Sequence, residues 1–180
     1  KRENTDDTEI AQGLLSKAIE LDNNLIAAKV LLGTTYSNMG DYDKAMDIYT
    51  PALKQAKELG DKQEMGANLN GIGLVYIFKG DFDTALDYYN KSLAIFEELG
   101  DKAGMGRNLN NIGNVYSSKG HSDKGLDCYE RSLVICEELG DKAEMGRTLG
   151  NIGIAYHDKV YYDKALGYYY RSLTIQEELG

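Results

Sequence analysis

The sequence repeats itself with a period of 40 residues, and this feature constrains the fold more than any other. Residues 101–140 and 141–180 are identical at 24 of 40 positions. Such a period is typical of chains built from small structural units that bury their apolar faces only by stacking on one another. A glycine and two tyrosines recur in every unit: Gly33, Gly73, Gly113 and Gly153; Tyr36, Tyr76, Tyr116 and Tyr156; and Tyr49, Tyr89, Tyr129 and Tyr169.

Each unit is predicted to be a hairpin of two helices. In the third unit, Leu109, Ile112 and Tyr116 follow the spacing of three and four residues that places side chains on one face of a helix. Leu126 and Leu133 continue this pattern on a second helix. In the second full unit, Gly80 can end the first helix and Asp81 can cap the second. We therefore expect an all-α chain of about nine helices, with the second helix of a partial repeat at 1–24 and hairpins at 25–60, 61–100, 101–140 and 141–180.

A large apolar residue, a glycine, a tyrosine, an alanine and an aromatic residue stand at fixed offsets in the second unit: Leu69, Gly73, Tyr76, Ala85 and Tyr89. This order resembles the tetratricopeptide repeat (TPR) family. The longer unit resembles the repeats of spindle-orientation adaptors, kinesin light chains and prokaryotic signalling TPR proteins. The resemblance implies a right-handed superhelical solenoid of antiparallel helix hairpins, with a concave surface lined by the first helices. Because the chain starts inside a repeat, we expect it to be a piece of a longer array.

The repeated glycines and tyrosines are expected to serve packing. A glycine in the interior of a helix costs about 1 kcal/mol relative to alanine. A close approach between helices at Gly73 and its equivalents would compensate for this cost. The repeated tyrosines are expected to lie in the core, because a single hairpin cannot bury its apolar face alone.

The rest of the sequence argues against several classes of function. The formal net charge of −9 disfavours nucleic acid and anionic membrane surfaces, both of which attract clustered lysine and arginine. The chain has no apolar run of about 18 residues. We expect a cytoplasmic protein whose cysteines, Cys128 and Cys136, stay reduced. His121 and His157 are the only histidines, and no catalytic, phosphate-binding or metal-binding motif is present. We predict no enzyme activity, no cofactor and no metal.

A polar stripe on the first helices is the candidate binding surface. Arg107, Asn110 and Asn114 are spaced by three and four residues, so they share one helix face away from the packing residues. Asn111 and Asn151 lie next to the stripe, and the resemblance implies that they hold the backbone of a ligand. The predicted peptide-binding residues are Asn70, Leu74, Phe78, Arg107, Asn110, Asn111, Asn114, Arg147, Asn151 and His157.

Arg107 and Arg147 are the most specific residues of this stripe. A guanidinium group can hold a carboxylate through paired hydrogen bonds worth about 1.5–3 kcal/mol. We predict that the chain is a protein-binding scaffold or adaptor that takes an extended, acidic peptide segment in its groove. Two alternatives stay open. Both arginines could pair with glutamates of the array itself, and the chain could form a homo-oligomer by self-association through the apolar ends of the repeat stack.

Overall fold

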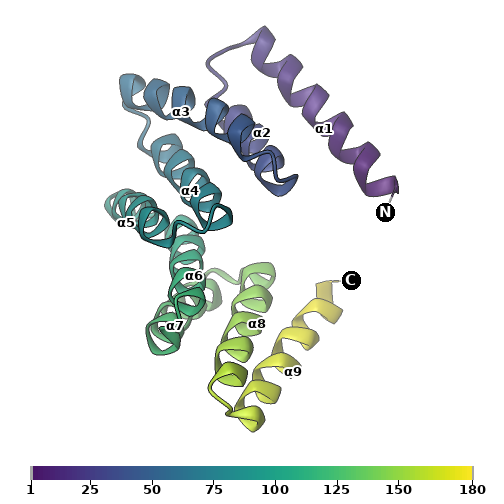
Figure 1. The fold of residues 1–180 in the computed structure, drawn as a ribbon, viewed down its shortest axis with the longest axis vertical. Helices are drawn as coiled ribbons and strands as arrows, with labels where there is room; N and C mark the ends of the chain where they lie inside the picture. Colours follow the sequence, from purple (N-terminus) through teal and green to yellow (C-terminus); the bar gives the residue numbers. More distant parts are fainter. Residues whose placement is uncertain (1, 180) are drawn as a thin grey trace. The chain divides into compact units, whose positions relative to one another are not determined.

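The described part of the chain, residues 2–179, folds into nine α-helices. The computed structural model describes the backbone of residues 2–179 and the side chains of residues 8–179, and this part of the chain contains no strand. The predicted all-α fold class is confirmed. The helices, labelled in Figure 1, are α1 (Arg2–Leu21), α2 (Ile26–Asn38), α3 (Tyr42–Leu59), α4 (Lys62–Phe78), α5 (Phe82–Leu99), α6 (Lys102–Ser118), α7 (Ser122–Leu139), α8 (Lys142–Asp158) and α9 (Tyr162–Leu179).

Aspartates and glycines mark the helix ends, as the sequence indicated. Asp61, Asp101 and Asp141 precede α4, α6 and α8, and each carboxylate accepts a hydrogen bond of 3.0–3.1 Å from the backbone N–H three residues later. Gly60 and Gly140 follow α3 and α7 with φ angles of 68° and 67°. Glycine adopts this left-handed conformation without the steric penalty of a side chain.

Val160 departs from this rule in the turn between α8 and α9. The three preceding hairpins have Gly40, Gly80 and Gly120 at this position. Val160 has a φ angle of 66° and is the one residue other than glycine with positive φ among those described. The left-handed conformation costs a residue with a side chain roughly 1–2 kcal/mol. The last hairpin therefore has a strained turn.

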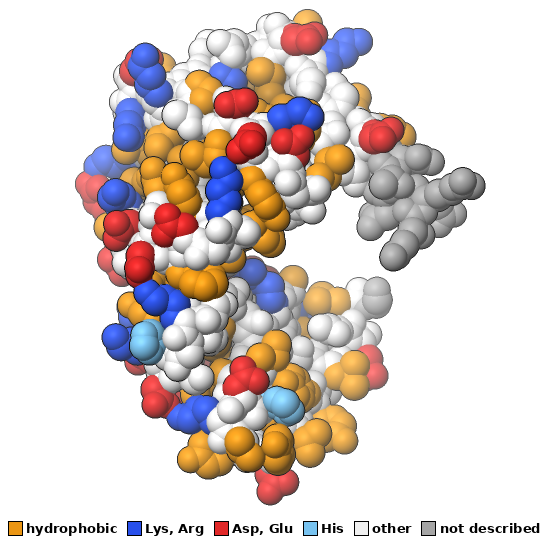
Figure 2. Space-filling view, viewed as in Figure 1, with side chains coloured by type: hydrophobic (Ala, Val, Ile, Leu, Met, Phe, Trp, Pro, Cys, Tyr) orange, Lys and Arg blue, Asp and Glu red, His pale blue; other side chains and the backbone are white. Residues whose placement is uncertain are grey.

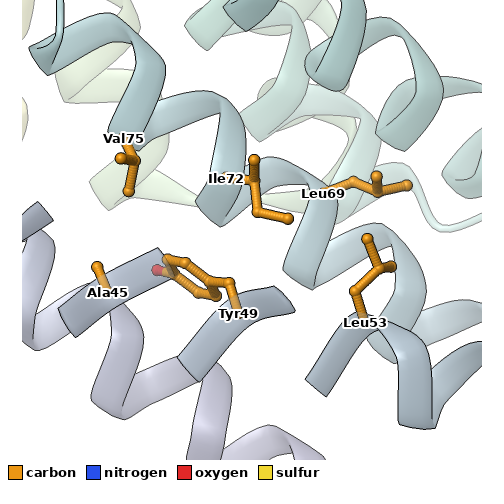
Figure 3. Packing of buried hydrophobic residues seen from close by; sticks show 6 residues of the cluster. All are labelled: Ala45, Tyr49, Leu53, Leu69, Ile72 and Val75. Carbon is orange, nitrogen blue, oxygen red and sulfur yellow. The ribbon is translucent and has the colours of Figure 1, made fainter. Parts of the chain in front are cut away.

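Residues 1–95 form a compact unit. Within it, α1 packs against α2, α2 packs against α3 and α4, and α3 packs against α4. A cluster of buried side chains, none more than 9% exposed, joins α3 to α4. Figure 3 shows these residues facing one another across the two helices: Ala45, Tyr49, Leu53, Leu69, Ile72 and Val75.

Residues 96–180 form a second compact unit. Here α6 packs against α7 and α8, α7 packs against α8, and α8 packs against α9. The helices α8 and α9 run side by side in opposite directions (Figure 1). The core between α7 and α8 repeats the pattern of the first unit and contains Leu126, Tyr129, Leu133, Leu149, Ile152 and Ala155.

The repeated glycine allows the two helices of a hairpin to approach closely. A Cβ atom placed on Gly113 would lie 2.5 Å from Cε1 of Tyr129, which is closer than such atoms approach in proteins. A Cβ atom on Gly33 would lie 2.7 Å from Cε1 of Tyr49. The two tyrosines are buried, with 2% and 0% of their surface exposed. The predicted close approach of the helices, and the core position of these tyrosines, are confirmed.

A buried serine joins the second helix to the first in three hairpins. Its hydroxyl group donates a hydrogen bond of 2.7–2.8 Å to a glycine carbonyl 26 residues earlier. This bond satisfies a polar group inside the hairpin and fixes the position of one helix along the other. The pairs are Ser92 with Gly66, Ser132 with Gly106, and Ser172 with Gly146.

Candidate peptide-binding groove

A surface hollow of about 290 Å³ lies between the first helices α6 and α8. The two helices contribute polar side chains and one isoleucine to its lining, and α7 contributes a tyrosine. Such a mixture offers donors and acceptors beside an apolar contact, as peptide-binding surfaces require. The lining residues are Asn114, Ser117, Ser118, Tyr129, Asn151, Ile154 and Asp158.

A network of side-chain amides holds the hollow in place. The Nδ2 group of Asn151 on α8 donates hydrogen bonds to Oδ1 of Asn110 at 3.0 Å and to Oδ1 of Asn114 at 3.1 Å, both on α6. The hydroxyl group of Tyr129 donates to Oδ1 of Asn114 at 2.8 Å. These bonds tie three helices together, so Asn114 and Asn151 are fixed before any ligand arrives.

Asn110 lies beneath this surface and is fully buried. Its Nδ2 group donates to Oε1 of Glu144 at 3.2 Å. Because both ends of the amide are used inside the protein, Asn110 positions Asn151 and Glu144. Asn110, predicted to contact a ligand, is buried and instead supports the side chains around it.

The two predicted arginines differ in their surroundings. Arg147 is paired with Glu144, three residues earlier on α8, through two hydrogen bonds to the carboxylate. Gly104 occupies the corresponding position on α6, so Arg107 has no glutamate there. Arg107 is exposed and forms no ion pair with the described residues. The alternative of pairing with a glutamate of the array therefore holds for Arg147 and not for Arg107.

The other predicted residues lie at varying depth. Asn111 on α6 is half-buried. His157 at the end of α8 is exposed, and its ring centroid lies 5.4 Å from that of Tyr162. In the N-terminal unit, α4 carries the half-buried Asn70 and Leu74 and the exposed Phe78, whose ring stacks on Tyr42 at 5.4 Å. Of the predicted residues, Asn114 and Asn151 line the hollow.

Tyr129 and Glu144 have roles at this site that were not predicted from the sequence. Tyr129 is a core residue, as predicted, and it also lines the hollow. The backbone N–H of Glu144 donates to the capping Asp141, and its carboxylate holds Arg147 and Asn110. The spacing of three residues between Glu144 and Arg147 was the available signal for their contact.

Glu64 in the N-terminal unit is the counterpart of Glu144 but has no arginine beside it. Ala67 stands where Arg147 would be. Glu64 is half-buried, and its Oε2 atom has no hydrogen-bond partner among the described residues. Burial raises the pKa of Glu64, and the charge of Asp61 raises this pKa further. The carboxylate form of Glu64 is therefore disfavoured in the folded protein.

Replacing Ala67 with arginine is expected to stabilise the protein by about 1 kcal/mol near pH 7. The raised pKa means that Glu64 favours folding when it is protonated, and this contribution is lost as the pH rises through the folded-state pKa. The new guanidinium group would stabilise the carboxylate, so the gain should be small near pH 4, where glutamate is largely protonated. Urea unfolding at both pH values measures it. An equal gain at both would contradict the explanation.

The described residues contain no cluster of three or more histidine, cysteine, aspartate or glutamate side chains that could hold a metal ion. Among the helices described, none has the length and apolar character needed to cross a membrane. Cys128 and Cys136 are buried free thiols, and burial raises the pKa of each.

Comparison with known proteins agrees with these observations. The tetratricopeptide repeat profile matches residues 24–98 and 104–178. No curated protein sequence matches the chain. Among solved structures, BtubC (BKLC) from P. vanneervenii is similar, with a TM-score of 0.78 and 25% identity, over 99% of this chain and 76% of that chain.

Two less identical structures share the fold. The signal transduction ATPase (STAND) protein with a tetratricopeptide repeat sensor from Pyrococcus horikoshii has a TM-score of 0.75 and 21% identity, over 94% of this chain and 28% of that chain. The kinesin light chain-like repeats from Podosopora anserina have a TM-score of 0.66 and 12% identity, over 98% of this chain and 90% of that chain. The repeat pattern, the helix hairpins and these matches lead to one conclusion: the chain belongs to the tetratricopeptide repeat family.

Proposed function

We propose that the chain is a non-catalytic scaffold that binds an extended, acidic peptide segment of another protein along α6 and α8. The proposal rests mainly on Arg107. Its side chain is an exposed cation without a carboxylate partner among the described residues. It shares a helix with Asn114, whose amide is already fixed by Asn151 and Tyr129. Helix α6 therefore carries both a cation that can bind an acidic side chain of the ligand and a fixed amide that can bind the ligand's backbone.

The spacing of these groups suits an extended peptide. Arg107 and Asn114 are two helical turns apart, which corresponds to about 10 Å along the axis. Three residues of extended chain span a similar distance at about 3.3 Å each. Asp158, which lines the hollow, would repel a second carboxylate. We therefore expect the acidic residue of the ligand near Arg107 and a neutral one near Asp158.

Selection from a random nonapeptide library on the immobilised protein tests this proposal. The bound peptides are expected to be enriched in aspartate or glutamate. The Arg107→Glu variant should weaken the selected peptides by about ten- to a hundred-fold, because a charge-assisted hydrogen bond is replaced by repulsion. Fluorescence anisotropy with a labelled selected peptide measures this change.

Arg131→Glu is the matched control, because Arg131 is an exposed arginine on α7, a second helix. It makes the same charge change away from the hollow and should leave the affinity unchanged. Circular dichroism should give both variants the melting temperature of the parent protein. Selection of neutral peptides, or equal binding by the Arg107→Glu variant, would contradict the proposed groove.

Self-association is a second candidate, favoured by exposed apolar side chains on α9. Leu166 and Leu173 are 52% and 50% exposed. Leu126 and Leu133 occupy the same positions on α7 and are 7% and 8% exposed in the core with α8. Light scattering over a concentration series tests this candidate, and a mass that stays at one chain would count against it.

A further inference from the structure

The last hairpin departs from the repeat at three positions that lie close to one another in the sequence. Val160 replaces the turn glycine of the earlier hairpins, Tyr161 replaces the aspartate that precedes α3 and α5, and Gly167 replaces an aspartate. The equivalents of Gly167 in the other hairpins are Asp47, Asp87 and Asp127.

These departures do not improve the packing of the core. Val160 adopts a strained positive φ angle, and 64% of its surface is exposed. Tyr161 is 53% exposed, and a Cβ atom on Gly167 would have no neighbour within 4 Å. Local rules of sequence are most often broken at functional sites, where strain and lost caps are tolerated for another purpose. Packing within the hairpin therefore does not account for Val160, Tyr161 and Gly167.

A pocket of about 350 Å³ opens at this surface. Apolar side chains gather around the turn between α8 and α9 (Figure 2). The rings of Tyr156 and Tyr168 are stacked with their centroids 5.4 Å apart, as those of Tyr76 and Tyr88 are at 5.5 Å. The ring of Tyr161 makes a T-shaped contact with that of Tyr156, with centroids 6.4 Å apart. The pocket is separate from the groove, because none of its lining residues lines the hollow between α6 and α8. Its lining residues are Tyr156, Lys164, Gly167, Tyr168 and Arg171.

Two cations flank the stacked tyrosines. Lys164 Nζ lies 5.3 Å from the ring centroid of Tyr156, and the guanidinium carbon of Arg171 lies 5.6 Å from that of Tyr168. One nitrogen of Arg171 is 3.4 Å from Glu137 in an exposed ion pair, which water screens strongly. The lining contains no acidic residue, because Gly167 stands where the other hairpins have aspartate. Two cations therefore line the pocket in a chain of net charge −9.

We propose that this pocket binds an aromatic ring that carries an anionic group, such as an aryl phosphate. The ring would occupy the space left open at Gly167 and pack on the tyrosines. The anionic group would accept hydrogen bonds from Lys164 and Arg171, since arginine holds phosphate oxygens through two parallel bonds. The volume lies at the small end of the range for ligand sites, so it suits one substituted ring.

NMR titration of the ¹⁵N-labelled chain with phenyl phosphate tests the proposal. Saturable shifts are expected for backbone amides within residues 161–171. Inorganic phosphate offers only the anion and phenol offers only the ring, so each should bind at least about ten-fold more weakly than phenyl phosphate. Equal binding of inorganic phosphate and phenyl phosphate, or no saturable shift with phenyl phosphate, would overturn the proposal.

Gly167→Asp is the decisive variant because it restores the residue that α3, α5 and α7 carry at this position. It should keep the fold and weaken phenyl phosphate by about ten-fold or more, because it fills the pocket and repels the anion. Lys124→Ala on α7 changes the counterpart of Lys164 and should have no effect. Unchanged binding by Gly167→Asp would show that the ligand lies elsewhere and would also overturn the proposal.

A pentapeptide of phosphotyrosine flanked by glycines distinguishes the two sources of such a group. Tighter binding than phenyl phosphate would assign the pocket to a side chain of a partner protein. Binding of phenyl phosphate together with exclusion of the peptide would assign it to a free small molecule. Both outcomes support an aryl phosphate as the ligand. They differ only in whether a protein side chain or a free small molecule carries that group.

Discussion

Replacing Gly113 with leucine is expected to lower the free energy of unfolding by about 3 kcal/mol. The Cβ atom alone would lie 2.5 Å from Cε1 of Tyr129, and the remaining carbons would have to enter the same interface between α6 and α7. The ring cannot move aside, because Tyr129 is 2% exposed and bonded to Asn114. The helices would separate or the ring would leave the core. Urea unfolding followed by circular dichroism measures the loss.

Gly150→Ala provides the matched control for this prediction. Gly150 also lies inside a first helix, but its added Cβ atom would meet only Ser172 Oγ, at an ordinary distance of 3.7 Å. Alanine favours helix over glycine by about 1 kcal/mol, so this variant should be more stable than the parent. The two substitutions are therefore expected to have opposite signs. A loss of stability in both would mean that glycine is required for a reason other than close approach.

Replacing Tyr49 with alanine is expected to destabilise the N-terminal unit by about 3–5 kcal/mol, as removal of a fully buried aromatic ring generally does. The ring lies between two glycines, because a Cβ atom on Gly33 or on Gly71 would approach it to 2.7 Å or 2.4 Å. No neighbouring side chain can collapse into the cavity from those two sides. The hydroxyl group also lies 2.9 Å from Thr34 Oγ1. Calorimetry should show a lower melting temperature.

Tyr170→Ala is the control for this second prediction. Tyr170 lies on α9, and 67% of its surface is exposed. Its removal should change the free energy of unfolding by no more than about 0.5 kcal/mol. Tyr49→Phe separates the ring from the hydroxyl group, and it should cost about 1 kcal/mol, the value of one hydrogen bond. If Tyr49→Ala and Tyr170→Ala had similar effects, burial between the glycines would not explain the role of Tyr49.

The helices and their packing faces could be predicted because the signals are local and repeated. Gly113 and Tyr129 recur with fixed spacing, and a glycine inside a helix has a cost that only close packing explains. The capping aspartates act on an N–H three residues away. A pattern read within one helix or one turn was sufficient for these elements.

The chemistry of the groove could not be predicted fully, because it depends on neighbours in other helices. Asn151 reaches Asn110 and Asn114 across 41 and 37 residues of sequence. No local pattern in the sequence indicates that the side chain of Asn110 forms its hydrogen bonds inside the protein. Arg147 is ion-paired and Arg107 is not, because a glutamate lies three residues before Arg147 only. This difference is visible in the sequence, but the contact itself is known only from the positions of the side chains.

The buried serines also bear on how quickly the chain folds. Each serine bonds to a carbonyl 26 residues earlier, so every such contact closes a loop of the same modest length. Loop-closure entropy grows only with the logarithm of that length, and proteins dominated by local contacts fold fast. Folding can therefore start in any hairpin and spread to its neighbours. The time needed to form one hairpin should be independent of how many others are joined to it.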